Sequence, residues 1–103
     1  MTEYEKLVSQ LREQCRIDCS DFFKCQLTWI TSRKLYPHHI IKRSQGGLDT
    51  KENLIMVDFY VHRWYHDGEK VFKKQMEAIG LGKRSDKLYK IMDGKLAKDE
   101  KIL

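Results

Sequence analysis

The chain has 103 residues, a net charge of +5 and a sequence pI of about 9.1. Its hydrophobic content of 41% and charged content of 34% are typical of a soluble globular domain and exclude a disordered chain, so we predict one domain over residues 1–103. No apolar run approaches the ~20 residues that span a bilayer, and no secretion signal is visible, so we expect a cytoplasmic protein without a membrane partner.

The first quarter of the chain predicts a helix and then an irregular segment. Apolar side chains recur at helical spacing over residues 3–16, which predicts an amphipathic helix there. The polar segment Asp18–Asp21 ends this helix or caps a short second one. The segment Cys25–Ile30 is rich in aromatic and β-branched residues and is consistent with a strand or a buried connector.

The middle of the chain predicts strand, loop, strand and helix. Pro37 cannot lie inside a helix and holds the preceding residue extended, so the segment after it is expected to be a short strand. Asp58 is a good N-cap for a helix, which Gly68 would end. The expected elements are a strand over residues 38–41, a loop over 42–52, a strand over 53–57 and a helix over 59–66.

Two more helices are expected in the C-terminal part. Apolar residues lie on one side of the segments 69–79 and 85–96, and the glycine-containing sequence GLGK separates them. The charged tail KDEKIL is expected to fray. The fold class is therefore α+β, with a ββα core over about 35–67 and helical support from 1–24 and 69–97.

Three cysteines, Cys15, Cys19 and Cys25, lie within the first quarter of the chain. An odd number of cysteines without a secretion signal argues against a disulfide framework. A structural zinc ion usually needs two closely spaced pairs of ligands, and no second cysteine pair is present. We therefore expect buried free thiols.

All four histidines lie between residues 38 and 66. His62 and His66 are four residues apart, so they share one face of the predicted helix and can present two ring nitrogens to one metal ion. A third histidine from a neighbouring strand would complete a three-nitrogen site with positions open for water or substrate. His38 and His39 are adjacent and point to opposite faces of an ordinary strand, so both serve one reaction only if the strand ends there or the substrate spans the gap.

The order and spacing of these residues resemble the HNH endonucleases, the ββα-metal or His-Me finger nucleases that include the colicin DNases and many phage and homing enzymes. The pattern is a His pair (His38, His39), a Gly pair (Gly46, Gly47), Asn53 fourteen residues after His39, His62 nine residues later and His66 four later. It covers about a third of the chain. The resemblance implies a ββα-metal unit flanked by N- and C-terminal helices.

The resemblance also implies a role for each residue. His39 would be the general base that deprotonates the attacking water, and Asn53 would hydrogen-bond across the loop and hold His39 in position. His38, His62 and His66 would bind one divalent metal ion (Mg, Mn, Zn, Ni or Co), although His66 could instead cap the end of its helix. The products would carry 5′-phosphate and 3′-hydroxyl ends.

The chain departs from many members of the family in one respect. Those members carry two CxxC pairs that bind a structural zinc ion, whereas Asp58 and Val61 stand at the places of the second pair. The first helix and the aromatic residues Phe22, Phe23 and Trp29 are expected to support the ββα unit instead.

The excess of positive charge begins at the histidine segment. Residues 1–25 hold four basic and five acidic groups, residues 26–50 hold four and one, and residues 51–103 hold twelve and nine. Cationic surfaces favour a polyanionic partner, and double-stranded DNA is the one that the resemblance implies. The candidate phosphate-binding residues near the histidines are Arg33, Lys42, Arg43 and Arg63.

Other functions fit the same residues. The ββα unit could be a non-catalytic module that binds DNA or a protein around a structural metal ion, or the same site could cut RNA. Cutting both strands of a duplex from one small site would need a homodimer, two encounters or a partner such as a phage packaging enzyme. If a phage encodes the protein, it would act in the host cytoplasm.

Overall fold

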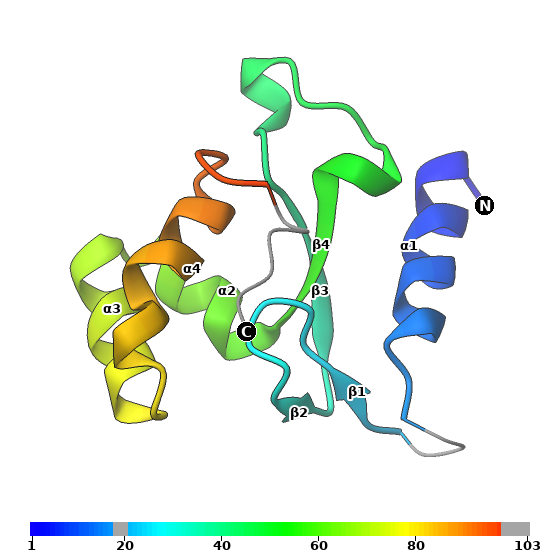
Figure 1. Cartoon of the computed structure of the whole chain (residues 1–103). Helices are drawn as coiled ribbons and strands as arrows, with labels where there is room; N and C mark the ends of the chain where they lie inside the picture. Colours follow the sequence, from blue (N-terminus) through cyan, green and yellow to red (C-terminus); the bar gives the residue numbers. More distant parts are fainter. Residues whose placement is uncertain (18–20, 98–103) are drawn as a thin grey trace.

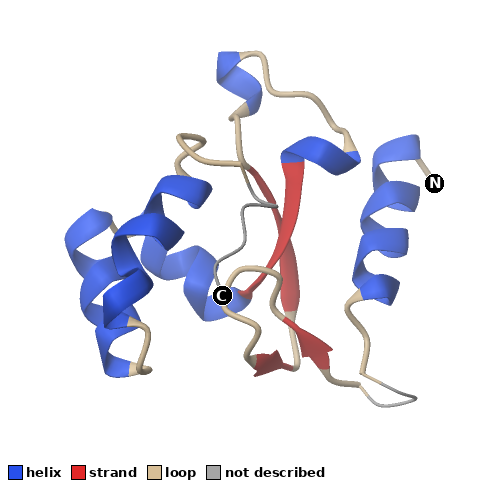
Figure 2. Cartoon of the chain, viewed as in Figure 1, coloured by secondary structure: helices blue, strands red, loops and turns tan. Residues whose placement is uncertain are grey.

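Two antiparallel strands form the centre of the molecule. The computed structural model describes residues 1–17 and 21–97 and pairs β3 (Leu35–His39) with β4 (Leu54–Asp58). On one side of this hairpin lies α1 (Glu3–Gln14), and on the other lie α2 (Phe59–His66), α3 (Glu69–Ala78) and α4 (Ser85–Met92) (Figure 1). A second, very small antiparallel sheet consists of β1 (Phe23–Lys24) and β2 (Thr31–Ser32) (Figure 2). The α+β class is confirmed.

Helix α1 begins at a capping box. The Thr2 hydroxyl accepts a hydrogen bond from the Glu5 backbone N–H at 3.1 Å, and the Glu5 carboxylate accepts from the Thr2 backbone N–H. The helix ends at Gln14, two residues before the predicted end, because Arg16 already forms a β-bridge with Phe23. The predicted break at Asp18–Asp21 falls largely outside the described residues.

The segment Cys25–Ile30 is an irregular connector and not a strand, and it is buried at Cys25, Leu27 and Thr28 but exposed at Trp29 and Ile30. The backbone N–H of Gln26 donates to the Met56 carbonyl at 2.9 Å, and the Gln26 side-chain oxygen accepts from the Met56 N–H at 2.8 Å. Trp29 then turns the chain with a positive φ of 62°. Of the three aromatic residues expected to support the ββα unit, Phe23 is buried as predicted, whereas Trp29 is 57% exposed and Phe22 is 37% exposed.

Strand β3 is Leu35–His39, so it begins earlier than the predicted segment 38–41 and ends at His39. Pairing with β4 decides these bounds, because Leu35 lies opposite Asp58 and His39 lies opposite Leu54. Pro37 fits into the strand since it faces Met56 in a pair whose backbone groups point outward, where no N–H is needed.

Helix α2 occupies the predicted residues 59–66, and Asp58 is its N-cap. Asp58 Oδ1 accepts hydrogen bonds from the backbone N–H groups of Tyr60 at 2.8 Å and Val61 at 3.3 Å, while Oδ2 accepts from the Ser32 hydroxyl. The next helix, α3, ends one residue before its predicted end. Helix α4 ends at Met92, four residues before its predicted end, where Gly94 adopts a φ of 77°. The predicted fraying of the charged tail concerns residues 98–103, which lie outside the described part.

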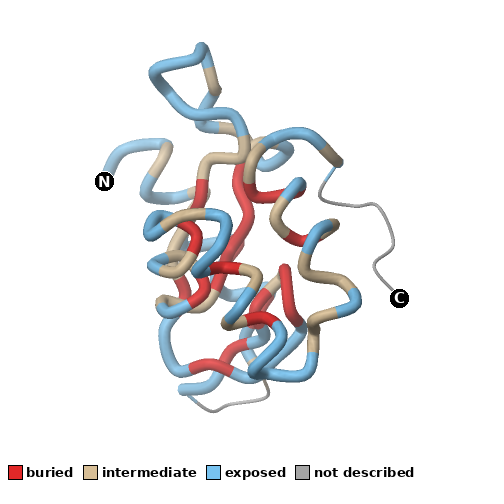
Figure 3. The backbone as a smooth tube through the Cα atoms, turned by 90° about the vertical axis from the view of Figure 1, so that its left-hand side faces the viewer, coloured by how far each residue is buried: buried red, intermediate tan, exposed pale blue. Residues whose placement is uncertain are grey.

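The core surrounds the hairpin, as the buried segments in Figure 3 show. Leu54–Val57 of β4 are all buried, so this strand is covered on both faces. Tyr65 on α2 donates a hydrogen bond to Asp93 Oδ1 at 2.7 Å, which fastens the end of α4 to α2. Among the described helices, none combines the length and the apolar character needed to cross a membrane.

The N-cap of α2 yields a stability prediction. We expect Asp58→Ala to lower the free energy of unfolding by about 1–2 kcal/mol, because two N–H groups and the Ser32 hydroxyl lose their acceptor. For a chain of this size, each kcal/mol of lost stability lowers Tm by roughly 4–8 °C.

Thermal denaturation followed by circular dichroism measures this effect. Asp67→Ala removes the same charge from the opposite end of α2 and serves as the matched control, with an expected change within about 0.5 kcal/mol. Equal losses in the two variants would contradict the capping role.

Candidate active site

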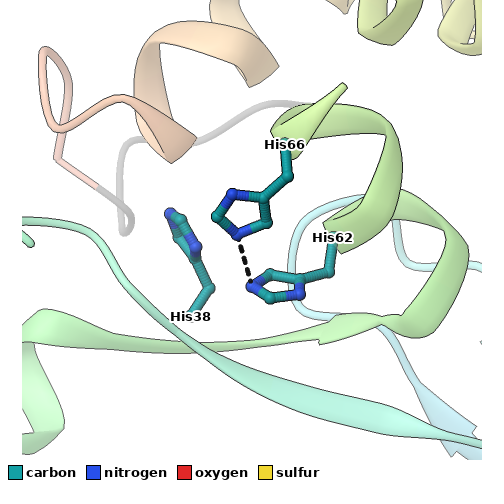
Figure 4. A group of neighbouring side chains, drawn as sticks. All are labelled: His38, His62 and His66. Carbon is teal, nitrogen blue, oxygen red and sulfur yellow. Dashed lines mark hydrogen bonds between the residues drawn. The ribbon is translucent and has the colours of Figure 1, made fainter. Parts of the chain in front are cut away.

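Three of the four histidines meet beside the hairpin. Helix α2 presents His62 and His66 one turn apart, and β3 presents His38 toward them. One ring nitrogen from each of the three lies within 4.8 Å of the others. Figure 4 shows the three rings turned toward one another. The structure therefore brings together the three residues that the sequence suggested as metal ligands.

The spacing of two of these nitrogens is close to that of two ligands of one small divalent ion. His62 Nε2 and His66 Nε2 are 3.1 Å apart. Two nitrogens bound tetrahedrally to zinc at about 2.1 Å lie roughly 3.4 Å from each other. In the protein alone, one of the two rings donates a hydrogen bond to the other, drawn as the dashed line in Figure 4. Three neutral imidazoles suit zinc, nickel, cobalt or manganese, and they leave coordination positions for water or substrate.

A backbone carbonyl fixes the orientation of His38. The ring is 4% exposed, and its Nε2–H donates to the Met92 carbonyl oxygen at 2.7 Å. Histidines that bind a metal ion commonly donate the N–H of their other ring nitrogen in this way, and here the lone pair remains on Nδ1. Burial lowers the pKa of His38 to about 4, and burial together with the neighbouring His66 lowers the pKa of His62. Both rings are therefore neutral at pH 7, the state in which histidine binds metals.

His39 belongs to a different cluster. It is the last residue of β3, and the register sends its side chain to the face opposite His38, toward α1. His39 Nε2 lies 2.7 Å from Asp49 Oδ1, and the Tyr4 ring of α1 stacks on the imidazole at a centroid distance of 5.7 Å. The guanidinium of Arg43 in turn lies over the Tyr4 ring, with its Cζ atom 4.8 Å from the ring centroid.

Asn53 ties the loop between the two strands together. Its Oδ1 accepts from the Ile41 N–H at 2.8 Å, and its Nδ2 donates to the carbonyls of Ile41 at 3.0 Å and Leu48 at 2.9 Å. Asn53 thus bonds across the loop as expected, and its hydrogen bonds go to the loop backbone and not to His39. Gly47 permits this closure, since a Cβ there would lie 1.7 Å from the Ile41 carbonyl oxygen.

The candidate phosphate-binding residues are all exposed. Arg43 is held in the loop, with Nη2 3.0 Å from Asp49 Oδ1. Arg33 lies over the Phe22 ring at 5.0 Å, near the start of β3. Arg63 lies on α2 directly after His62, and Lys42 lies at the start of the loop.

The sequence reasoning missed three groups around the histidines: Asp49, Tyr4 and the Met92 carbonyl. Tyr4 and Met92 lie on helices that are distant from the histidines along the chain, and no local sequence pattern predicts their contacts with His39 and His38. Asp49 lies four residues before Asn53 in a loop, and a single loop carboxylate has no distinctive signal. Only the folded chain reveals its partner.

Comparisons with protein family models, with curated proteins and with solved structures found no match for this chain.

The histidine cluster yields a binding prediction. We expect the wild-type protein to bind one Zn²⁺ ion, and His62→Ala to bind it at least about 10–100-fold more weakly, since even changes to outer partners of metal ligands cost that much. Isothermal titration calorimetry measures both affinities. His39→Ala is the matched control, because it removes an imidazole that points to the other face of the hairpin. This variant should bind Zn²⁺ as tightly as the wild type. Unchanged affinity in His62→Ala would remove this residue from the ligand set.

Proposed function

We propose that this protein is a metal-dependent endonuclease of the HNH type, which hydrolyses phosphodiester bonds of DNA to 5′-phosphate and 3′-hydroxyl ends. The observation that carries the proposal is the meeting of His38, His62 and His66 from a strand and the following helix, with His39 next to His38 at the strand end. The order His-His, Gly-Gly, Asn, His, His supports the same assignment. The hairpin and α2 would then be the ββα-metal unit.

Each group has a task in this proposal. A divalent ion held by the three histidines would bind a phosphate oxygen and stabilise the charge on the leaving 3′ oxygen. His39 accepts the proton of the attacking water. Asn53 fastens the loop that follows His39, since its amide bonds to Ile41 and Leu48. The Met92 carbonyl orients His38.

The position of His39 agrees with a substrate that spans the strand. The outer edge of β3 carries no partner strand in the described part of the chain, because β3 pairs with β4 alone. A phosphate at the end of this edge could reach the face of His38 and the face of His39 together. A substrate that spans the gap between the two faces is one of the two conditions under which adjacent histidines on a strand can serve one reaction.

The central test is cleavage of supercoiled plasmid with Mn²⁺ or Mg²⁺, compared between the wild type and His39→Ala. General-base catalysis typically contributes ~10²–10⁴-fold, so the variant should lose about that much single-turnover rate. Its Zn²⁺ affinity should stay unchanged because the three ligands remain. An RNA substrate in parallel decides between DNA and RNA cleavage.

Two results would contradict the assignment. Equal rates for the wild type and His39→Ala would exclude this residue as the base. Metal binding without cleavage of any nucleic acid would favour the non-catalytic module with a structural metal ion.

We propose further that DNA lies along a basic groove beside β3. The groove has a volume of about 250 Å³ and is lined by Arg12 of α1, by Phe23 and by residues 33–36. Its floor is apolar, because Phe23 and Leu35 are buried, whereas the cations Arg12, Arg33 and Lys34 are exposed. At its end, the Tyr36 ring stacks on His62 at a centroid distance of 6.2 Å, which joins the groove to the histidine cluster.

The three cations of the groove are available to phosphates. Within residues 1–17 and 21–97, no carboxylate oxygen forms an ion pair with Arg12, Arg33 or Lys34. The carboxylate of Asp58, close by along the chain, is turned to Ser32 and to the start of α2. A DNA backbone would therefore meet positive charge that no carboxylate of the described residues pairs with.

Salt-dependent DNA binding tests the groove. For the triple variant Arg12→Gln, Arg33→Gln, Lys34→Gln, the slope of log K against log salt should become shallower by about 0.9 for each lost phosphate contact. Fluorescence anisotropy in EDTA measures binding without cleavage. The matched control changes Lys70, Lys74 and Lys83 to Gln, which removes the same charge from an exposed region around α3. Equal slopes in the two triple variants would show that net charge alone acts.

A further inference from the structure

A carboxylate lies within hydrogen-bonding distance of one of the two ring nitrogens of His39. His39 Nε2 lies 2.7 Å from Asp49 Oδ1, and the side chain of His39 is only 16% exposed. Within the described residues, no hydrogen bond occupies the other nitrogen, Nδ1. The two nitrogens of this imidazole are therefore in different environments.

The position of the proton follows from these contacts. A carboxylate oxygen only accepts hydrogen bonds, so a contact of 2.7 Å is attractive only if Nε2 carries the proton. Arg43 Nε lies 3.3 Å from the same Nε2, and its N–H has a competing acceptor in Asp49 Oδ1 at 3.1 Å. Because the guanidinium can only donate, the arrangement is consistent when both His39 and Arg43 donate to Asp49. The neutral ring then keeps its lone pair on Nδ1.

Asp49 is itself held in place. Arg43 Nη2 binds the same carboxylate oxygen at 3.0 Å, and Asn53 bonds to the carbonyl of the preceding residue, Leu48, at 2.9 Å. The hydrogen bond from His39, followed by the contacts of Arg43, holds the pKa of Asp49 below its usual value. Tyr4 covers the imidazole from the side of α1. The carboxylate therefore stays charged and close to the ring.

We propose that Asp49 is a positioning residue that fixes His39 in the Nε2–H tautomer and thereby makes Nδ1 the atom that takes the proton from the attacking water. The role of Nδ1 in catalysis rests on the proposed nuclease function. The choice of tautomer does not, and it can be measured in a protein that cuts nothing.

Asp49→Asn is the informative substitution. The amide of Asn can donate to Nε2, and the Arg43 Nε–H at 3.3 Å can now do the same. Both contacts favour the tautomer with the proton on Nδ1. In that tautomer Nδ1 has no lone pair left to accept the proton of the attacking water. Asp49→Glu keeps a carboxylate and should restore the Nε2–H tautomer. Asp67→Asn is the matched control, because it neutralises an exposed carboxylate beyond the end of α2.

Long-range ¹H–¹⁵N NMR of the imidazole nitrogens reports the tautomer directly. With the full-length chain in EDTA and a neutral ring, we expect the wild type, Asp49→Glu and Asp67→Asn to show Nε2–H. Asp49→Asn should show an increased population of Nδ1–H. An unchanged tautomer in Asp49→Asn would overturn the proposal, whatever the cleavage assays give.

Single-turnover cleavage supplies the second measurement. Asp49→Asn should lose roughly 10²-fold or more of the rate, within the range that general-base catalysis contributes, while its Zn²⁺ affinity and DNA binding stay at the wild-type values. Asp49→Glu should recover part of the rate. A wild-type rate in Asp49→Asn with a shifted tautomer would overturn the catalytic part. Absence of cleavage in the wild type would instead refute the nuclease function, and the NMR result would still decide whether Asp49 sets the tautomer.

Discussion

The register between β3 and β4 determines to which side of the hairpin each of the adjacent histidines, His38 and His39, points. Leu35 faces Asp58 and His39 faces Leu54, so the alternation of the strand sends His38 to α2 and His39 to α1. A slip by one residue would exchange the two histidines between the faces. Bonds at both ends of the hairpin oppose such a slip. The Phe59 N–H donates to the Lys34 carbonyl at 3.1 Å, and the Ile40 N–H donates to the Asn53 carbonyl at 2.9 Å.

The separation of the two faces also divides the chemistry. On the α2 side, burial and the Met92 carbonyl keep His38 neutral and oriented, as metal binding requires. On the α1 side, His39 lies among charged and aromatic groups of a loop and a helix. The groups around the proposed base are therefore different from those around the proposed metal ligands. Substitutions on one face can change one function while the other stays intact.

Local signals in the sequence predicted the elements that carry local chemistry. Asp58 caps α2 as expected, and the i, i+4 spacing placed His62 and His66 on one face of that helix. The resemblance to HNH nucleases selected the three histidines that meet in the structure. Even so, the comparisons identify no family, and the activity stays a prediction.

What could not be predicted depends on contacts between distant segments. Cys25–Ile30 has the composition of a strand, yet Gln26 pairs with Met56 at one position only and the chain then turns at Trp29. The lengths of β3 and α4 were misjudged because pairing with Asp58 and the turn at Gly94 decide them. The partners of His38 and His39 were invisible for a similar reason. A hydrogen-bond acceptor in a loop or at a helix end has no periodic pattern.

The bond from His38 to the Met92 carbonyl joins a strand that is synthesised early to a helix that is synthesised late. All four histidines leave the ribosome well before Met92, yet His38 receives its orienting acceptor from a residue 54 positions further along the chain. A nascent chain that already contains the complete histidine pattern therefore still lacks the packed end of α4 and the Tyr65–Asp93 bond that fastens it. The assembly of the complete histidine cluster with its orienting acceptor therefore waits until α4 has been made and has docked on α2.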